Sequence, residues 1–92
     1  MIKITRLITN QIIIGYTQQN NETVTIKNPY VVIPEAQGIQ MYPFDEAIIG
    51  NVLESIDISL LNILYSTPAG TLMKDTYLEH KTGIEIPKLI LG

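Results

Sequence analysis

Chemistry-bearing residues are scarce in this 92-residue chain, which has no cysteine and a single histidine, His80. Disulfides and thiolate metal sites are therefore excluded, and one imidazole cannot supply a cluster of metal ligands. No serine lies in a Gly-x-Ser-x-Gly setting, and the glycines are too scattered to form a phosphate-binding loop. We expect a non-enzymatic protein with no catalytic residue, no metal and no cofactor.

Charge is also scarce, since only 16% of the residues are charged and the formal net charge is −3. A protein that grips duplex DNA neutralises many phosphates with basic side chains, so no duplex DNA partner is expected. A single strand remains a compatible ligand, because base stacking and hydrogen bonding do not require a basic protein.

Long hydrophobic runs are missing too. No apolar stretch approaches the roughly 18–20 residues of a membrane span, and no export signal is present, so we expect a cytoplasmic protein with no membrane partner. Yet 46% of the residues are hydrophobic, which is high for a chain with room for one core. The surplus predicts a single domain over residues 1–92 that buries apolar surface in a homo-oligomer.

The segment 11–34 is the clearest structural pattern. Three consecutive isoleucines, 12–14, predict a strand covered on both faces, in a barrel or under a neighbouring subunit. The polar residues 18–22 predict a turn, and the alternation of polar and apolar residues over 23–27 predicts the next strand. Asn28 and Pro29 interrupt that strand, which favours a bend or bulge within one long curved strand.

The rest of the chain adds strands and a helix. Further strands are expected at 2–8, at 39–44 and over 56–65, where residues 60–62 form a tight connection. Residues 45–55 fit either a strand continuation broken at Gly50 or a short helical turn. Thr67 and Pro68 predict the start of a helix over 67–82 that Gly83 ends, and the apolar tail 84–92 is expected to pack on the domain or a neighbour.

We therefore predict a mainly β fold. Short consecutive strands within residues 1–66 favour a small, strongly bent, five-stranded antiparallel barrel, because closing the sheet removes exposed edges, and the C-terminal helix follows it.

The polar turn is the candidate binding site. Its amides could read base edges and Tyr16 could stack on a base, although a solvated hairpin turn explains the same residues. The remaining aromatic side chains are better explained as core or interface residues.

Two segments carry a family resemblance. LITNQIIIGYTQQNNETVTIKN, with Gly15, resembles the first motif of the Sm/LSm-like family, and LLNILYSTP, with Asn62, resembles the second. Together with the helix after STP, the chain looks closest to the Sm-like proteins of marine T4-like phages.

The resemblance implies a ring-forming protein that binds single-stranded RNA and affects its processing or stability, in the infected host cell if it is phage-encoded. It implies that two loops face the ring lumen and that one strand pairs with a neighbour. The RNA-binding candidates are Tyr16, Gln18, Asn20, Asn21 and Asn62, and the interface candidates are Ile63, Leu64 and Tyr65.

The motifs also depart from the family. Asn21 and Thr25 stand at the usual acidic and asparagine positions of the first motif, and Leu60 and Leu61 replace the Arg-Gly of the second. The alternative is therefore a structural or protein-interaction module that has the barrel but binds no RNA.

Overall fold

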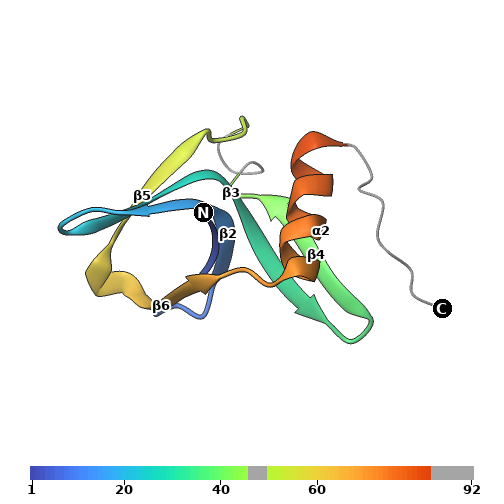
Figure 1. Cartoon of the computed structure of the whole chain (residues 1–92), viewed down its shortest axis with the longest axis horizontal. Coiled ribbons are helices and arrows are strands. Elements are labelled where there is room, and N and C mark those ends of the chain that lie inside the picture. The colour runs from blue at the N-terminus through green and yellow to red at the C-terminus, as the bar shows by residue number, and fades with distance from the viewer. Residues whose placement is uncertain (46–49, 84–92) are drawn as a thin grey trace.

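Six strands and one α-helix make up the described part of the chain, residues 1–45 and 50–83 of a computed structural model (Figure 1). All strand pairs are antiparallel, so the mainly β prediction is confirmed. The elements in chain order are β1 (Ile2–Leu7), β2 (Ile12–Gln19), β3 (Thr23–Glu35), β4 (Gly38–Pro43), β5 (Ser55–Ser59), the 3-10 turn η1 (Leu60–Asn62), β6 (Ile63–Pro68) and α2 (Thr71–Thr82).

The described sheet has six strands rather than the predicted five, because η1 divides the predicted segment 56–65 into β5, which pairs with β3, and β6, which pairs with β1. β4 pairs with the Tyr30–Glu35 half of β3, and β5 pairs with the Thr23–Lys27 half. Between them the chain leaves the ladder; residues 50–54 are neither strand nor helix, and residues 46–49 lie outside the described residues. Both expectations for 45–55 therefore fail over 50–54.

The described sheet is open rather than a closed barrel. Its strand order is β4-β3-β2-β1-β6, and β5 pairs only with β3. η1 connects β5 to β6 across the opening. It is held there by two main-chain bonds, from the Leu60 N–H to the Glu22 carbonyl at 3.0 Å and from the Ile8 N–H to the Asn62 carbonyl at 2.9 Å.

The predicted bend in β3 is confirmed. The register of β2 against β3 shifts between Ile14 and Tyr16, so Gly15 alone faces two residues of β3, Asn28 and Pro29. A Cβ atom on Gly15 would lie 2.5 Å from the Cγ2 of Ile26 and 2.8 Å from a backbone oxygen. The bend therefore needs glycine at this position, because only glycine allows the two backbones so close.

Main-chain groups at the bend find partners outside the ladder. Asn28 takes a left-handed conformation with φ of 51°, and its N–H donates to the Glu54 carbonyl at 2.7 Å. The Phe44 N–H donates to the Pro29 carbonyl at 3.0 Å. Phe44, just after β4, and Glu54, just before β5, thus satisfy the main-chain groups of β3 that the bend removes from strand pairing.

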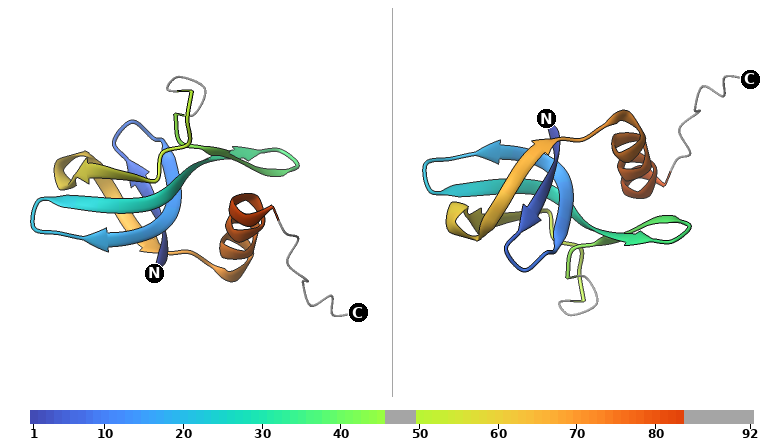
Figure 2. Two further views of the ribbon diagram at one scale, coloured as in Figure 1. Left: turned by 90° about the horizontal axis from the view of Figure 1, so that it is seen from above. Right: turned by 90° about the horizontal axis from the view of Figure 1, so that it is seen from below.

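β2 is buried on both faces at Ile13 and Ile14, as the three isoleucines predict. Ile13 points into the concave side and Ile14 points toward α2, and both are fully buried. The concave cluster is Ile13, Val24 and Ile26 with Leu7, Phe44, Ile56, Ile58, Leu60 and Ile63 around them. The cluster under the helix is Ile2, Ile14, Val32, Met41 and Tyr77, with Ile4, Ile12, Tyr16, Tyr30, Ile39, Ala69, Met73 and Leu78 packed against it. The chain's own helix, not a neighbouring subunit, covers the second face (Figure 2).

The helix begins later than predicted. Thr67 and Pro68 belong to β6, where they pair with Ile4 and Lys3 of β1, and α2 begins after an N-cap at Gly70. Ladder pairing overrides the local helix-start signal. The predicted end is confirmed, since Gly83 caps the helix in a left-handed conformation with φ of 70°. The tail 84–92 lies outside the described residues, so the prediction that it packs is not addressed.

Candidate nucleic-acid interface

The β2–β3 ribbon presents one polar face. Tyr16 lies opposite Lys27 and Gln18 opposite Thr25, and Asp57 of β5 is the next neighbour of Thr25. Because successive side chains of a strand alternate between faces, these residues share one side while Val24 and Ile26 fill the concave core on the other. The polar residues that the sequence singles out therefore lie along one surface.

Asn20 is held at the end of this face. Its Nδ2 donates to the Thr25 hydroxyl at 2.9 Å and to the Thr23 hydroxyl at 3.2 Å, and Thr25 donates in turn to Asp57 Oδ1 at 2.5 Å. Both amide hydrogens are thus engaged, and the Asn20 side-chain oxygen is the group left to accept from a ligand. The network also fixes the shape of the β2–β3 turn.

The turn carrying Asn21 lies beside η1, which carries Asn62. The main-chain bond between Leu60 and Glu22 joins the two segments, and a depression between them is lined by Asn21, Glu22, Ser59, Leu60 and Leu61. Asn21 and Asn62 are both exposed, and within residues 1–45 and 50–83 neither side chain forms a hydrogen bond. Asn62 lies at the far end of η1, next to Ile8. The two predicted loops are therefore adjacent, with free amides.

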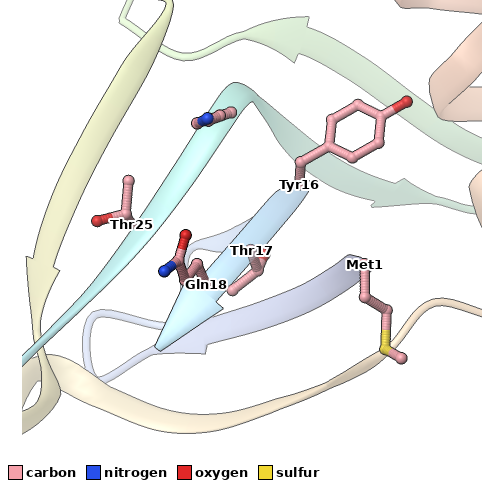
Figure 3. A pocket seen from close by; sticks show the side chains of 6 residues that line it. Met1, Tyr16, Thr17, Gln18 and Thr25 are labelled. Atoms are coloured by element: carbon pink, nitrogen blue, oxygen red, sulfur yellow. The ribbon is translucent and has the colours of Figure 1, made fainter. Parts of the chain in front are cut away.

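Tyr16 lies apart from these loops. Its ring meets the fully buried Tyr77 of α2 edge to face, with 6.0 Å between centroids, and the Lys81 Nζ lies 4.7 Å from its centroid. With Gln18 it lines a pocket of about 150 Å³, whose other lining residues are Met1, Thr17, Thr25 and Lys27 (Figure 3). The predicted site thus divides into a loop region, with Asn20, Asn21 and Asn62, and this Tyr16 pocket.

Tyr77 attaches α2 to the sheet beside Tyr16. It donates a hydrogen bond to the Asn28 carbonyl at 2.8 Å, at the bend of β3, and Tyr30 packs on it edge to face at 5.6 Å. Burial raises the pKa of the Tyr77 hydroxyl well above its ordinary range, and the neighbouring hydroxyls of Tyr16 and Tyr30 add to the effect. Tyr77 is therefore a neutral hydrogen-bond donor.

Two lysines beside Tyr16 escaped the sequence prediction. Lys27 could have been found from strand alternation once its pairing with Tyr16 was known. Lys81 could not, because its approach to Tyr16 depends on how α2 packs on the sheet.

The interface candidates lie on an edge strand. β6 pairs with β1 alone among the described strands, and Leu64 and Tyr65 are 58% and 47% exposed. Ile63 instead packs against the chain's own concave cluster.

The described residues contain neither a cluster of metal ligands nor a membrane-spanning helix. No group of three or more His, Cys, Asp or Glu residues that could hold a metal ion lies within 1–45 and 50–83. In the same ranges, no helix is long and apolar enough to cross a membrane. His80 is exposed, and its Nδ1 lies 2.9 Å from the Thr76 carbonyl.

Comparison with known proteins gives no further identification: no protein-family model matches this chain, and no curated protein matches it.

Proposed function

We propose that this chain is an Sm-like, ring-forming protein that binds single-stranded RNA and acts in RNA processing or stability. The observation that carries the proposal is the adjacency of two amide-bearing loops, the Asn21 turn and η1 with Asn62, through the Leu60 to Glu22 main-chain bond. Free amides on neighbouring loops are suited to the edges of unpaired bases, which offer both donors and acceptors.

The strand arrangement supports the ring. β4 and β5 follow the same side of β3 one after the other, so they count as one interrupted strand of a bent five-stranded barrel. Among the described strands, β6 has one edge without a partner, and so does the β4–β5 side of the sheet. We propose that β6 of one copy pairs with that side of the next, because main-chain bonds between free edges join subunits head to tail and close into a ring.

The native mass of the purified protein, with and without ribonuclease, tests the assembly. A ring is expected, and its mass should fall after ribonuclease treatment if RNA is carried. A strict monomer at high protein concentration would contradict the ring.

RNA binding is tested separately with short single-stranded oligonucleotides. The substitutions Asn21→Ala and Asn62→Ala should each weaken binding. Asn51→Ala is the matched control, because Asn51 is also exposed but lies in the irregular segment before β5. Affinity that is unchanged in the double variant N21A/N62A would refute the loop site.

A second candidate, the structural or protein-interaction module, is favoured by the aliphatic surface around η1. Leu61 is 89% exposed, Leu64 58% and Ile8 54%. Exposed apolar groups near one another are typical of protein contacts. A ring that binds no RNA at low salt would favour this function.

A further inference from the structure

Lys27, Lys81 and Tyr16 converge on one surface, although the helix and the ribbon are far apart in the sequence. Lys27 is paired with Tyr16 across the β2–β3 ladder, and the Lys81 ammonium lies 4.7 Å from the Tyr16 ring centroid. The chain has only six basic residues and a net charge of −3, so two of the six beside one aromatic ring form a distinct positive site.

Within the described ranges, neither lysine is engaged in a salt bridge that would compete with a phosphate, and Asp57, the nearby acid of β5, is bound to Thr25. Glu54 lines a neighbouring depression with Lys27 but is not paired with it. Because Lys81 is exposed, its contact with the Tyr16 ring is weak, so its ammonium is able to exchange the ring for a phosphate oxygen.

The polar face of β2 connects this site to the amide loops. Tyr16 and Gln18 lie on the same side of the strand, and Asn20 follows at the start of the turn. At about 3.3 Å per residue, four residues span roughly 13 Å. A strand of RNA held at the loops therefore has a continuous polar path to the pocket.

We propose that the Tyr16 pocket is a second contact for the RNA strand, where one base packs on Tyr16 and Gln18 while Lys27 and Lys81 bind the flanking phosphates. This inference rests on the proposed function and extends it to an outer surface. The pocket volume of about 150 Å³ is well below the roughly 300 Å³ of sites that enclose a whole ligand, which fits a single base lying in a chain that continues past it.

The test is the salt dependence of RNA binding for Lys27→Gln, Lys81→Gln and the double variant, measured with a single-stranded oligonucleotide between 50 and 200 mM salt. Each lost phosphate contact should lower the slope of log affinity against log salt by about 0.7, so the double variant should lose about 1.4. Lys81→Arg keeps the charge and should retain the wild-type slope.

Lys74→Gln is the matched control. Lys74 is exposed on the same helix, about two turns from Lys81, so Lys74→Gln removes the same single charge as Lys81→Gln, about 10 Å away. If K27Q and K81Q each change the salt slope no more than K74Q does while N21A/N62A weakens binding, the pocket is not a contact and the proposed function stands. If the wild-type protein binds no RNA at low salt, both proposals fail.

Photocrosslinking gives a readout that does not depend on folding of a variant. An oligonucleotide that carries 5-iodouracil should crosslink to Tyr16 itself in the wild-type protein, with the site assigned to single residues by fragmentation mass spectrometry. Crosslinks confined to residues 20–22 and 60–62 would overturn the pocket contact and leave the loop site intact.

Discussion

The substitution Tyr77→Phe tests how the helix is attached to the sheet. Tyr77 is fully buried, and its hydroxyl donates to the Asn28 carbonyl at the bend of β3, at 2.8 Å. Phenylalanine keeps the ring and its edge-to-face contacts but removes this donor. Leaving this partly buried carbonyl without its partner should lower the free energy of unfolding by about 1–2 kcal/mol at pH 7.

The same substitution should change the dependence of stability on pH. Burial raises the pKa of Tyr77 in the folded protein, whereas in the unfolded chain it ionises near pH 10, the ordinary value for tyrosine. The contribution of this pKa shift is therefore fully present below about pH 10 and is lost as the pH rises through the folded-state value. By pH 11 the wild type should have lost about 1.4 kcal/mol through this group, and the phenylalanine variant nothing.

The two proteins should therefore approach equal stability near pH 11. The measurement is denaturant unfolding of both, followed by circular dichroism between pH 7 and 11.5; titrations common to the two proteins cancel in the difference. Tyr42→Phe is the matched control, because Tyr42 is 50% exposed. Removing its hydroxyl should change the free energy of unfolding by less than about 0.5 kcal/mol. A wild-type advantage over Tyr77→Phe that stays constant across this range, or grows, would refute the reasoning.

Substitutions at three further positions test the backbone, each measured by chemical or thermal unfolding. Gly15→Ala should destabilise the fold by about 1–3 kcal/mol, because the new Cβ would lie 2.8 Å from the Lys27 carbonyl oxygen; wild-type stability would show that the strands separate easily there. Asn28→Ala should cost about 1–2 kcal/mol because φ is 51°, whereas Asn28→Gly should cost little, and equal losses would rule out conformational strain as the cause. Gly70→Asp should stabilise α2 by about 0.3–1 kcal/mol, since the N-cap makes no side-chain bond at present and has open space; an unchanged midpoint would contradict this.

Local patterns predicted most of the elements. The bend of β3 was predictable because proline lacks an N–H and polar alternation stops at Asn28. The end of α2 was predictable because Gly83 accepts the left-handed conformation of a helix cap. The helix start failed because Thr67 and Pro68 serve a ladder with β1, a partner that no local window contains.

The candidate site divides in the same way. The exposed amides of Asn21 and Asn62 follow from polar residues in turns, which the sequence displays directly. The separation of Tyr16 from those loops does not, since it depends on the packing of Tyr77 and Lys81 from α2 against β2. Neither contact leaves a signal in the spacing of residues.

By itself, the sequence determined which residues alternate along a strand, where β3 bends and where α2 ends. Steric limits and hydrogen-bonding capacity act between near neighbours in the chain, so local patterns record them. The tertiary structure alone decided that β4 and β5 share one side of β3, that the helix covers Ile14, and that two lysines meet at Tyr16. The physical reason is that burial and strand pairing act between surfaces, and which surfaces meet is settled only when the whole chain packs.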